Sequence, residues 1–125
     1  MKILLATQKP FAAAAVNGIR SILEEAGNEV VLLEKYAGED ELVAAVADVD
    51  AMIIRSDKVT ARVLDAAPKL KIVVRAGAGF DNVDLAAATA HGVVVENTPG
   101  QNSNAVAELA IAMMIYMSRN QFTPA

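Results

Sequence analysis

The run from Arg75 to Asp84, which reads RAGAGFDNVD, places a cation and two glycines directly after an apolar segment, residues 70–74. Such a segment is typical of a buried strand, and ligands of open α/β sheets bind where the strands end. A guanidinium can hold a phosphate or a carboxylate through two parallel hydrogen bonds, and glycines leave backbone amides accessible. The run therefore predicts an anion-binding site.

The same glycines do not make a dinucleotide-binding loop. A G-x-G-x-x-G fingerprint that begins at Gly77 would need its third glycine at position 82, which is Asn82. We interpret the loop as a site for a substrate anion, and we expect no cofactor-binding residues here.

Other polar residues follow the remaining apolar segments. Arg55 and Ser56 come directly after residues 51–54, and Asn97 comes directly after residues 93–96. If these segments are parallel strands, their ends share one edge of the sheet, so two arginines, a hydroxyl and loop amides would form one anion site. The alternative for Arg55 is an ion pair with Asp57 or Asp81.

No residue stands out for catalysis. His91, the only histidine, precedes Gly92 near a predicted helix end, has no evident carboxylate partner in the sequence, and fits a helix terminus. Asp81 and Asp84 flank the start of a predicted helix and fit capping roles. No acidic cluster has the spacing of a metal loop. We expect no catalytic residue and no metal ligand in this sequence.

Turn residues divide the chain into alternating segments, which predict a flavodoxin-like, doubly wound α/β domain with a parallel five-stranded sheet and a long apolar final helix. The expected strands are residues 2–7, 29–33, 51–54, 70–74 and 93–96; the expected helices are residues 11–26, 40–47, 60–67, 83–91 and 104–120.

Composition supports one buried core. The chain has 125 residues, of which 54% are apolar and only 4% aromatic, as expected for a parallel sheet of aliphatic residues. A net charge of −4 argues against nucleic-acid binding. The absence of cysteine excludes disulfides, and no apolar run is long enough to span a membrane. We expect a cytoplasmic protein.

The segment 104–120 is apolar almost all round, as in helices that are buried on more than one side. Its predicted outer face, which includes Ile111, Met114 and Ile115, favours contact with another domain or another chain. We expect self-association through this helix. The alternative is an unusually apolar final helix of one small domain.

Three runs in order resemble the D-isomer-specific 2-hydroxyacid dehydrogenases. They are Ile54 to Ser56, Val74 to Leu85 and Asn97 to Leu109. The resemblance covers the whole chain, and it is nearest to members that act on a phosphorylated hydroxy acid. It implies that residues 1–103 are a substrate-binding domain, that residues 104–120 are a helix leading to a nucleotide-binding domain, and that residues 121–125 are a frayed tail.

The resemblance also implies roles for individual residues. Substrate phosphate and carboxylate would be held by Arg55, Ser56, Arg75 and the amides of Ala76, Gly77 and Ala78, with Asn97 and Asn102 near the interdomain cleft. The complete family enzyme uses NAD, but the family's cofactor loop and catalytic residues have no counterpart in this sequence. We therefore expect a truncated, inactive part of an NAD-dependent enzyme. The alternatives are a domain of a glyoxylate or hydroxypyruvate reductase and a non-catalytic flavodoxin-like binding module.

Overall fold

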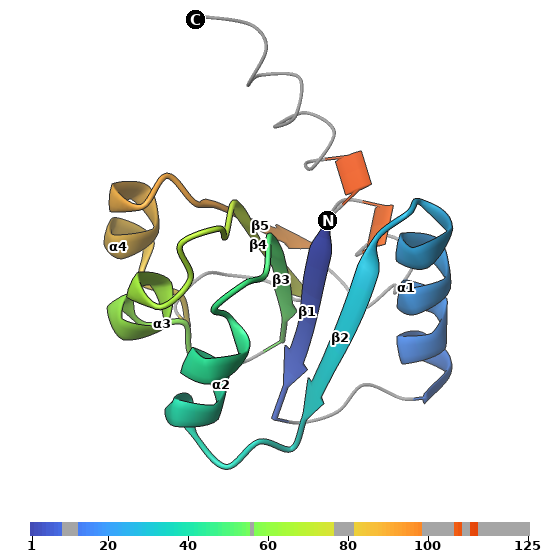
Figure 1. Cartoon of the computed structure of the whole chain (residues 1–125), viewed down its shortest axis with the longest axis horizontal. Helices are drawn as coiled ribbons and strands as arrows, with labels where there is room; N and C mark the ends of the chain where they lie inside the picture. The colour runs from blue at the N-terminus through green and yellow to red at the C-terminus, as the bar shows by residue number, and fades with distance from the viewer. Residues whose placement is uncertain (9–12, 56, 77–81, 99–106, 109–110, 113–125) are drawn as a thin grey trace, which may run out of the picture.

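The structure is a computed structural model, and it describes residues 1–8, 13–55, 57–76, 82–98, 107–108 and 111–112. Five parallel strands form one sheet (Figure 1). In spatial order they are β2 (Glu29–Glu34), β1 (Lys2–Thr7), β3 (Ala51–Ile54), β4 (Ile72–Ala76) and β5 (Val94–Thr98). This is the strand order of a flavodoxin-like sheet, so the predicted class and strand number are confirmed.

Helices cover both faces of the sheet, as a doubly wound fold requires. They are α1 (Ala13–Glu25), α2 (Glu39–Ala45), α3 (Ala61–Asp65) and α4 (Leu85–Ala90). Figure 1 shows α1 on one side of the sheet and the other three helices on the opposite side. Each connection between parallel strands therefore crosses over through a helix.

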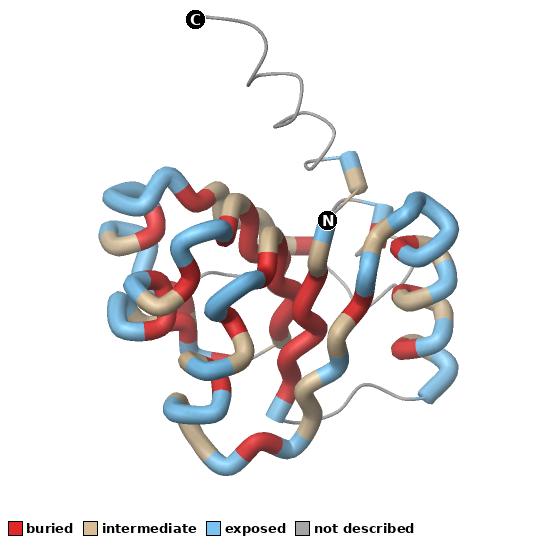
Figure 2. Tube along the Cα trace, in the orientation of Figure 1, coloured by how far each residue is buried: buried red, intermediate tan, exposed pale blue. Residues whose placement is uncertain are grey.

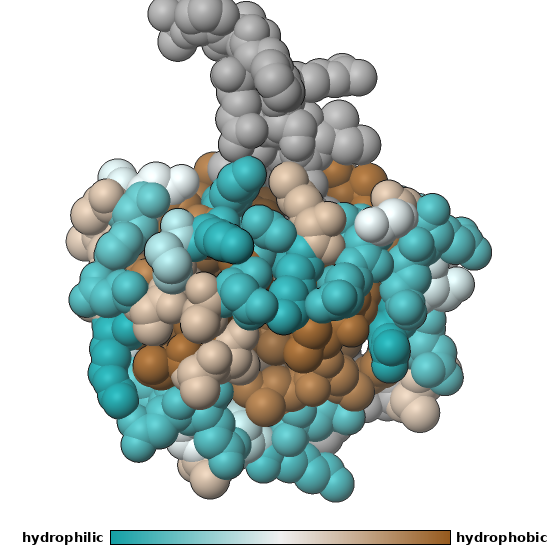
Figure 3. Space-filling view, in the orientation of Figure 1, coloured by the Kyte–Doolittle hydropathy of each residue, from teal (hydrophilic) through white to brown (hydrophobic). Residues whose placement is uncertain are grey.

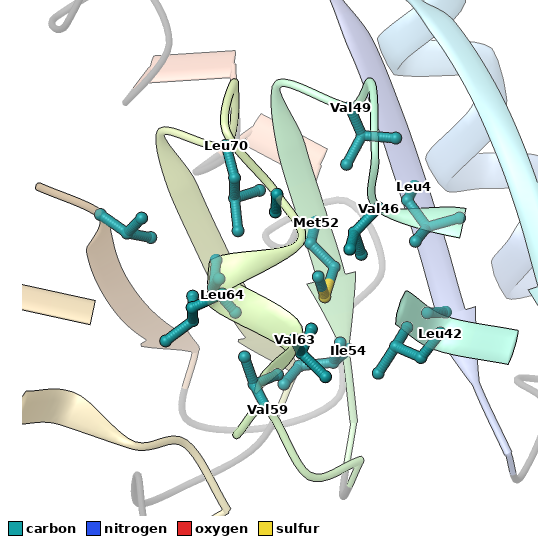
Figure 4. Close-up of a cluster of buried hydrophobic side chains, with 14 of the residues drawn as sticks. Leu4, Leu42, Val46, Val49, Met52, Ile54, Val59, Val63, Leu64 and Leu70 are labelled. Carbon is teal, nitrogen blue, oxygen red and sulfur yellow. The ribbon is translucent and has the colours of Figure 1, made fainter. Parts of the chain in front are cut away.

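Successive side chains of a strand point to opposite faces of the sheet, so the core consists of two layers. Leu4, Met52 and Ile54 point to the side of α2 and α3 and pack with residues of those helices, as Figure 4 shows. Their neighbours Ile3 and Ile53 pack with the α1 side. Because both faces are covered, the strands can be continuously apolar, and Figure 2 shows the central strands as buried.

Caps and glycines set the helix ends. The Thr60 hydroxyl accepts a hydrogen bond from Val63 N at 3.4 Å, and Asp84 Oδ1 accepts one from Ala87 N at 3.0 Å. The predicted capping role of Asp84 is thus confirmed; Asp81 lies outside the described residues. Gly27 and Gly92 follow α1 and α4 with φ of +89° and +70°, a region that favours glycine.

The predicted helix 104–120 lies mostly outside the described residues. Residues 107–108 and 111–112 are helical, and no long apolar helix is established. Ala107 is fully buried, and Ile111 is partly buried against the core layer of α1. The placement of Ile111 on an outer face was therefore wrong, because its side chain packs inward on this domain; Met114 and Ile115 are not described.

The visible surface is mostly hydrophilic, with an apolar area over the edge strand β2 (Figure 3). In that strand Val31 and Leu33 are partly buried, and Leu32 is exposed. Among the described residues, no helix combines the length and apolar character needed to cross a bilayer.

Two leucines paired across the sheet provide a matched test of this packing. Leu5 of β1 is in register with Leu32 of β2, but Leu5 is 0% exposed and Leu32 is 36% exposed. We expect Leu5→Ala to lower the free energy of unfolding by about 2–5 kcal/mol, because it leaves a cavity in the core. The same change at Leu32 should cost about 0.5 kcal/mol. Equal losses in urea denaturation would contradict the described burial.

Candidate functional site

The carboxyl ends of the strands bring the predicted arginines together. Arg55 directly follows β3, and Arg75 lies in β4 opposite Ile54. The guanidinium Nε of Arg75 donates a hydrogen bond to the backbone carbonyl of Arg55 at 3.1 Å. Both residues are half-buried. The prediction that these two cations share one edge of the sheet is confirmed.

The predicted fourth and fifth strands end before the observed strands do. We placed Arg75 and Asn97 in loops after the strands, but β4 continues to Ala76 and β5 to Thr98. Arg75 pairs in register with Asn97, and Ala76 pairs with Thr98. Parallel pairing satisfies backbone groups regardless of side-chain polarity, so the ladder extends beyond the apolar run that marked the predicted strand.

The remaining predicted site residues divide into two groups. Ala76 is buried at the end of β4, and Asn97 is half-buried in β5, next to Arg75. Ser56, Gly77, Ala78 and Asn102 lie outside the described residues.

Asp57 is the residue that the sequence prediction missed as a site component. It is only 4% exposed. Its Oδ2 accepts hydrogen bonds from Gln8 N at 2.9 Å and from the Tyr36 hydroxyl, and its Oδ1 accepts one from Arg55 N at 3.3 Å. We call Asp57 and these three donor residues the Asp57 cluster. The sequence suggested Asp57 only as an ion-pair partner of Arg55, whereas in the structure its carboxylate accepts a hydrogen bond from the Arg55 backbone amide.

The Asp57 cluster connects the ends of three strands. Gln8 follows β1, Tyr36 comes two residues after β2, and Arg55 follows β3. A buried carboxylate costs free energy unless hydrogen bonds replace its hydration. The three donors supply those bonds, so a single side chain fixes three loops at the edge of the sheet.

Asn82 joins the loop after β4 to the loop after β3. Its Nδ2 donates hydrogen bonds to Arg55 O at 3.2 Å and to Asp57 O at 2.7 Å. Val59 and Val83 form a parallel bridge beside it. A glycine at position 82 could make neither of these side-chain bonds, so Asn82 stabilises the loop in a way that a third loop glycine could not.

A pocket opens next to the Asp57 cluster on the side of α2. Its volume is about 470 Å³, and it is lined by Gln8, Tyr36, Glu39, Leu42, Lys58 and Thr60. Glu39 accepts hydrogen bonds from the Thr60 hydroxyl and from Arg62 Nη1, the latter at 3.1 Å. Within the described part of the chain, no group of three or more acidic or histidine side chains could hold a metal ion.

His91 has a partner that the sequence did not indicate. It is the C-cap of α4, in agreement with the predicted helix terminus, but its Nε2 lies 2.7 Å from Asp65 Oδ1. The expectation of no carboxylate partner was wrong, because α3 and α4 pack together and bring residues 26 positions apart into contact. Both side chains are largely exposed, so the pair contributes little to stability.

Tyr36 provides a pH-dependent test of the Asp57 cluster. It is 7% exposed, and burial together with the hydrogen bond to Asp57 raises the pKa of its phenol well above 10.0. A raised folded-state pKa means that the stabilisation is fully present below about pH 10 and is lost as the pH rises through the folded value. We expect the phenolate absorbance of wild type minus that of the Tyr36→Phe variant to appear only at a pH well above 10. Ionisation near pH 10 in the folded protein would show that Tyr36 is not buried against Asp57.

Comparison with known proteins shows which family and which relatives this chain resembles. The model of the "D-isomer specific 2-hydroxyacid dehydrogenase, catalytic domain" matches residues 11–121. D-3-phosphoglycerate dehydrogenase of Rattus norvegicus is 48% identical over 101 residues, which are 80% of this chain and 19% of that protein. The Mycobacterium tuberculosis H37Rv protein of the same name is 56% identical over 81 residues, 64% of this chain and 15% of its own length.

A solved structure extends the likeness to the whole fold. NAD⁺-bound 3-phosphoglycerate dehydrogenase of Entamoeba histolytica is 51% identical with a TM-score of 0.79, and the match covers 100% of this chain and 41% of that one. This chain spans less than a fifth of the length of the two curated relatives described above. The family model covers well over half of the chain, so the chain belongs to the D-isomer specific 2-hydroxyacid dehydrogenase family.

Proposed function

We propose that this chain is the substrate-binding domain of an NAD-dependent D-3-phosphoglycerate dehydrogenase, which oxidises 3-phosphoglycerate to 3-phosphohydroxypyruvate. Its relatives in rat and in Mycobacterium tuberculosis carry the name of that enzyme. The observation that carries the proposal is the placement of Arg55 and Arg75 at adjacent strand ends, with Arg75 Nε 3.1 Å from Arg55 O. A substrate with a phosphate and a carboxylate needs cations at such an edge.

The proposed contacts follow from this placement. Arg55 and Arg75 supply positive charge, and their guanidinium groups suit the planar oxygens of carboxylate and phosphate. The Ser56 hydroxyl and the amides of Ala76, Gly77 and Ala78 would add donors around the same anion. Asn97, which is in register with Arg75, and Asn102 would extend the site toward the cofactor.

NAD would be bound outside these residues. Gly77 and Gly79 are the only G-x-G pair in the sequence, and Asn82 in place of a third glycine does not fit a dinucleotide loop. We propose that residues 1–103 bind the substrate, that residues 104–120 lead toward a nucleotide-binding domain, and that residues 121–125 are a frayed tail.

The chain by itself should form no NADH from NAD and 3-phosphoglycerate. We also predict that it self-associates through residues 104–120.

Titration with substrate tests the proposed function. We expect 3-phosphoglycerate to bind the chain with a Kd on the order of 1 mM, because in the proposed enzyme the nucleotide-binding domain would supply the other side of the substrate site. Amide shifts should centre on the residues that surround Arg55 and Arg75. Arg75→Ala should weaken binding by about tenfold, because it removes a charge-assisted contact. Arg20→Ala, which truncates a partly buried arginine of α1 that pairs with Glu24, should leave the Kd unchanged.

The competing substrate class is tested by the same titration. Glycerate lacks the phosphate, so it should bind about tenfold more weakly than 3-phosphoglycerate if the two arginines receive two anionic groups. Equal binding of the two acids would favour a reductase for non-phosphorylated hydroxy acids. Shifts confined to the opposite, amino-terminal end of the strands would contradict the site itself.

A further inference from the structure

The backbone of Arg55 is held by side chains at both of its polar groups. Its N–H donates to Asp57 Oδ1 at 3.3 Å. Its carbonyl oxygen accepts from Arg75 Nε at 3.1 Å and from Asn82 Nδ2 at 3.2 Å. These bonds fix the backbone on both sides of the Arg55 Cα, and so they determine where the Arg55 side chain starts and where the Arg75 guanidinium is anchored.

Asp57 is itself held from the opposite side. Its Oδ2 accepts from Gln8 N at 2.9 Å and from the Tyr36 hydroxyl, while Gln8 Nε2 lies 3.5 Å from Tyr36 O. The bonds thus run in sequence from the ends of β1 and β2 to Asp57, from Asp57 to the Arg55 amide, and from the Arg55 carbonyl to Arg75. These bonds thereby connect the residues after β1, β2 and β3 with strand β4.

We propose that Asp57 and Tyr36 are positioning residues for the substrate anion site: they set the geometry of Arg55 and Arg75 without touching the substrate. The inference rests on the proposed function. A carboxylate beside a site for anions opposes binding by Coulomb repulsion. This repulsion must be offset if Asp57 is to lie beside the site. The fixed geometry of the two arginines offsets it, because preorganised groups lose less conformational freedom when the ligand binds.

The direction in which Asp57→Asn changes the Kd for 3-phosphoglycerate distinguishes a positioning role from a charge effect. Asp57→Asn removes the carboxylate and keeps the side-chain shape, but its amide cannot accept from Gln8 N, Tyr36 and Arg55 N at the same time. If charge dominated, 3-phosphoglycerate would bind more tightly to the variant. Positioning predicts the opposite, and we expect the Kd to rise by about tenfold, as for the loss of a buried hydrogen-bond partner. The Nε resonance of Arg75 should also shift without ligand, because its acceptor has moved.

Two further variants complete the experiment, which uses nitrogen-15 spectra of the 125-residue chain and 3-phosphoglycerate as the probe. Tyr36→Phe keeps the Asp57 carboxylate and removes one donor, so we expect a Kd about threefold higher than that of wild type. Asp48→Asn makes the same chemical change as Asp57→Asn at a carboxylate that is 57% exposed and pairs with Lys2, and it should not change the Kd.

Each outcome has a defined meaning. Unchanged or tighter binding by a folded Asp57→Asn chain overturns the positioning role. If that variant does not fold, Tyr36→Phe decides: an unchanged Kd and an unshifted Arg75 Nε resonance overturn the inference. Wild-type chain that does not bind 3-phosphoglycerate near Arg55 and Arg75 contradicts the proposed function first. Wild-type binding with unaffected variants contradicts only the role of Asp57 and Tyr36.

Discussion

The buried carboxylate of Asp57 is the interaction on which the carboxyl edge of the sheet depends. Parallel strands place their ends side by side, but they do not fix the loops that follow. Asp57 does so by accepting hydrogen bonds from Gln8, Tyr36 and Arg55, which follow three different strands. Because an unpaired buried carboxylate would be costly, any movement of these loops away from Asp57 is opposed by a loss of free energy. The buried Asp57 carboxylate needs hydrogen-bond donors, and the three residues that supply them fix the loops at this edge of the sheet.

The sheet supplies the rigid frame for this arrangement. Two core layers bury both faces, and the register places Arg75 between Ile54 and Asn97. Arg75 thus starts from a strand with buried neighbours rather than from a loose loop. Asn82 then closes the loop after β4 onto the carbonyls of Arg55 and Asp57. The cations are held by backbone and side-chain bonds together, which suits a site that must receive an anion without rearrangement.

The fold was predictable because apolar runs and turn residues are local signals, and the shared edge of Arg55 and Arg75 followed from parallel strand order. The strand ends at Ala76 and Thr98 were not predictable, because ladder hydrogen bonds extend past the apolar residues. Asp57, Tyr36 and Asn82 were missed for a different reason: apart from the local bond between Asp57 and the Arg55 amide, their contacts join residues 21 to 49 positions apart, and a polar residue in a loop gives no sign of its partner. Ile111 was assigned to the wrong face because a nearly uniform apolar segment carries no directional pattern.

The most direct measurement is an experimental structure of the chain with 3-phosphoglycerate bound. The account predicts that the anionic groups of the ligand lie against the guanidinium groups of Arg55 and Arg75, at the carboxyl edge, while the Asp57 carboxylate still accepts from Gln8 N, Tyr36 and the Arg55 amide. A ligand seated instead in the pocket between Tyr36 and Lys58, or one that contacts Asp57 directly, would contradict it.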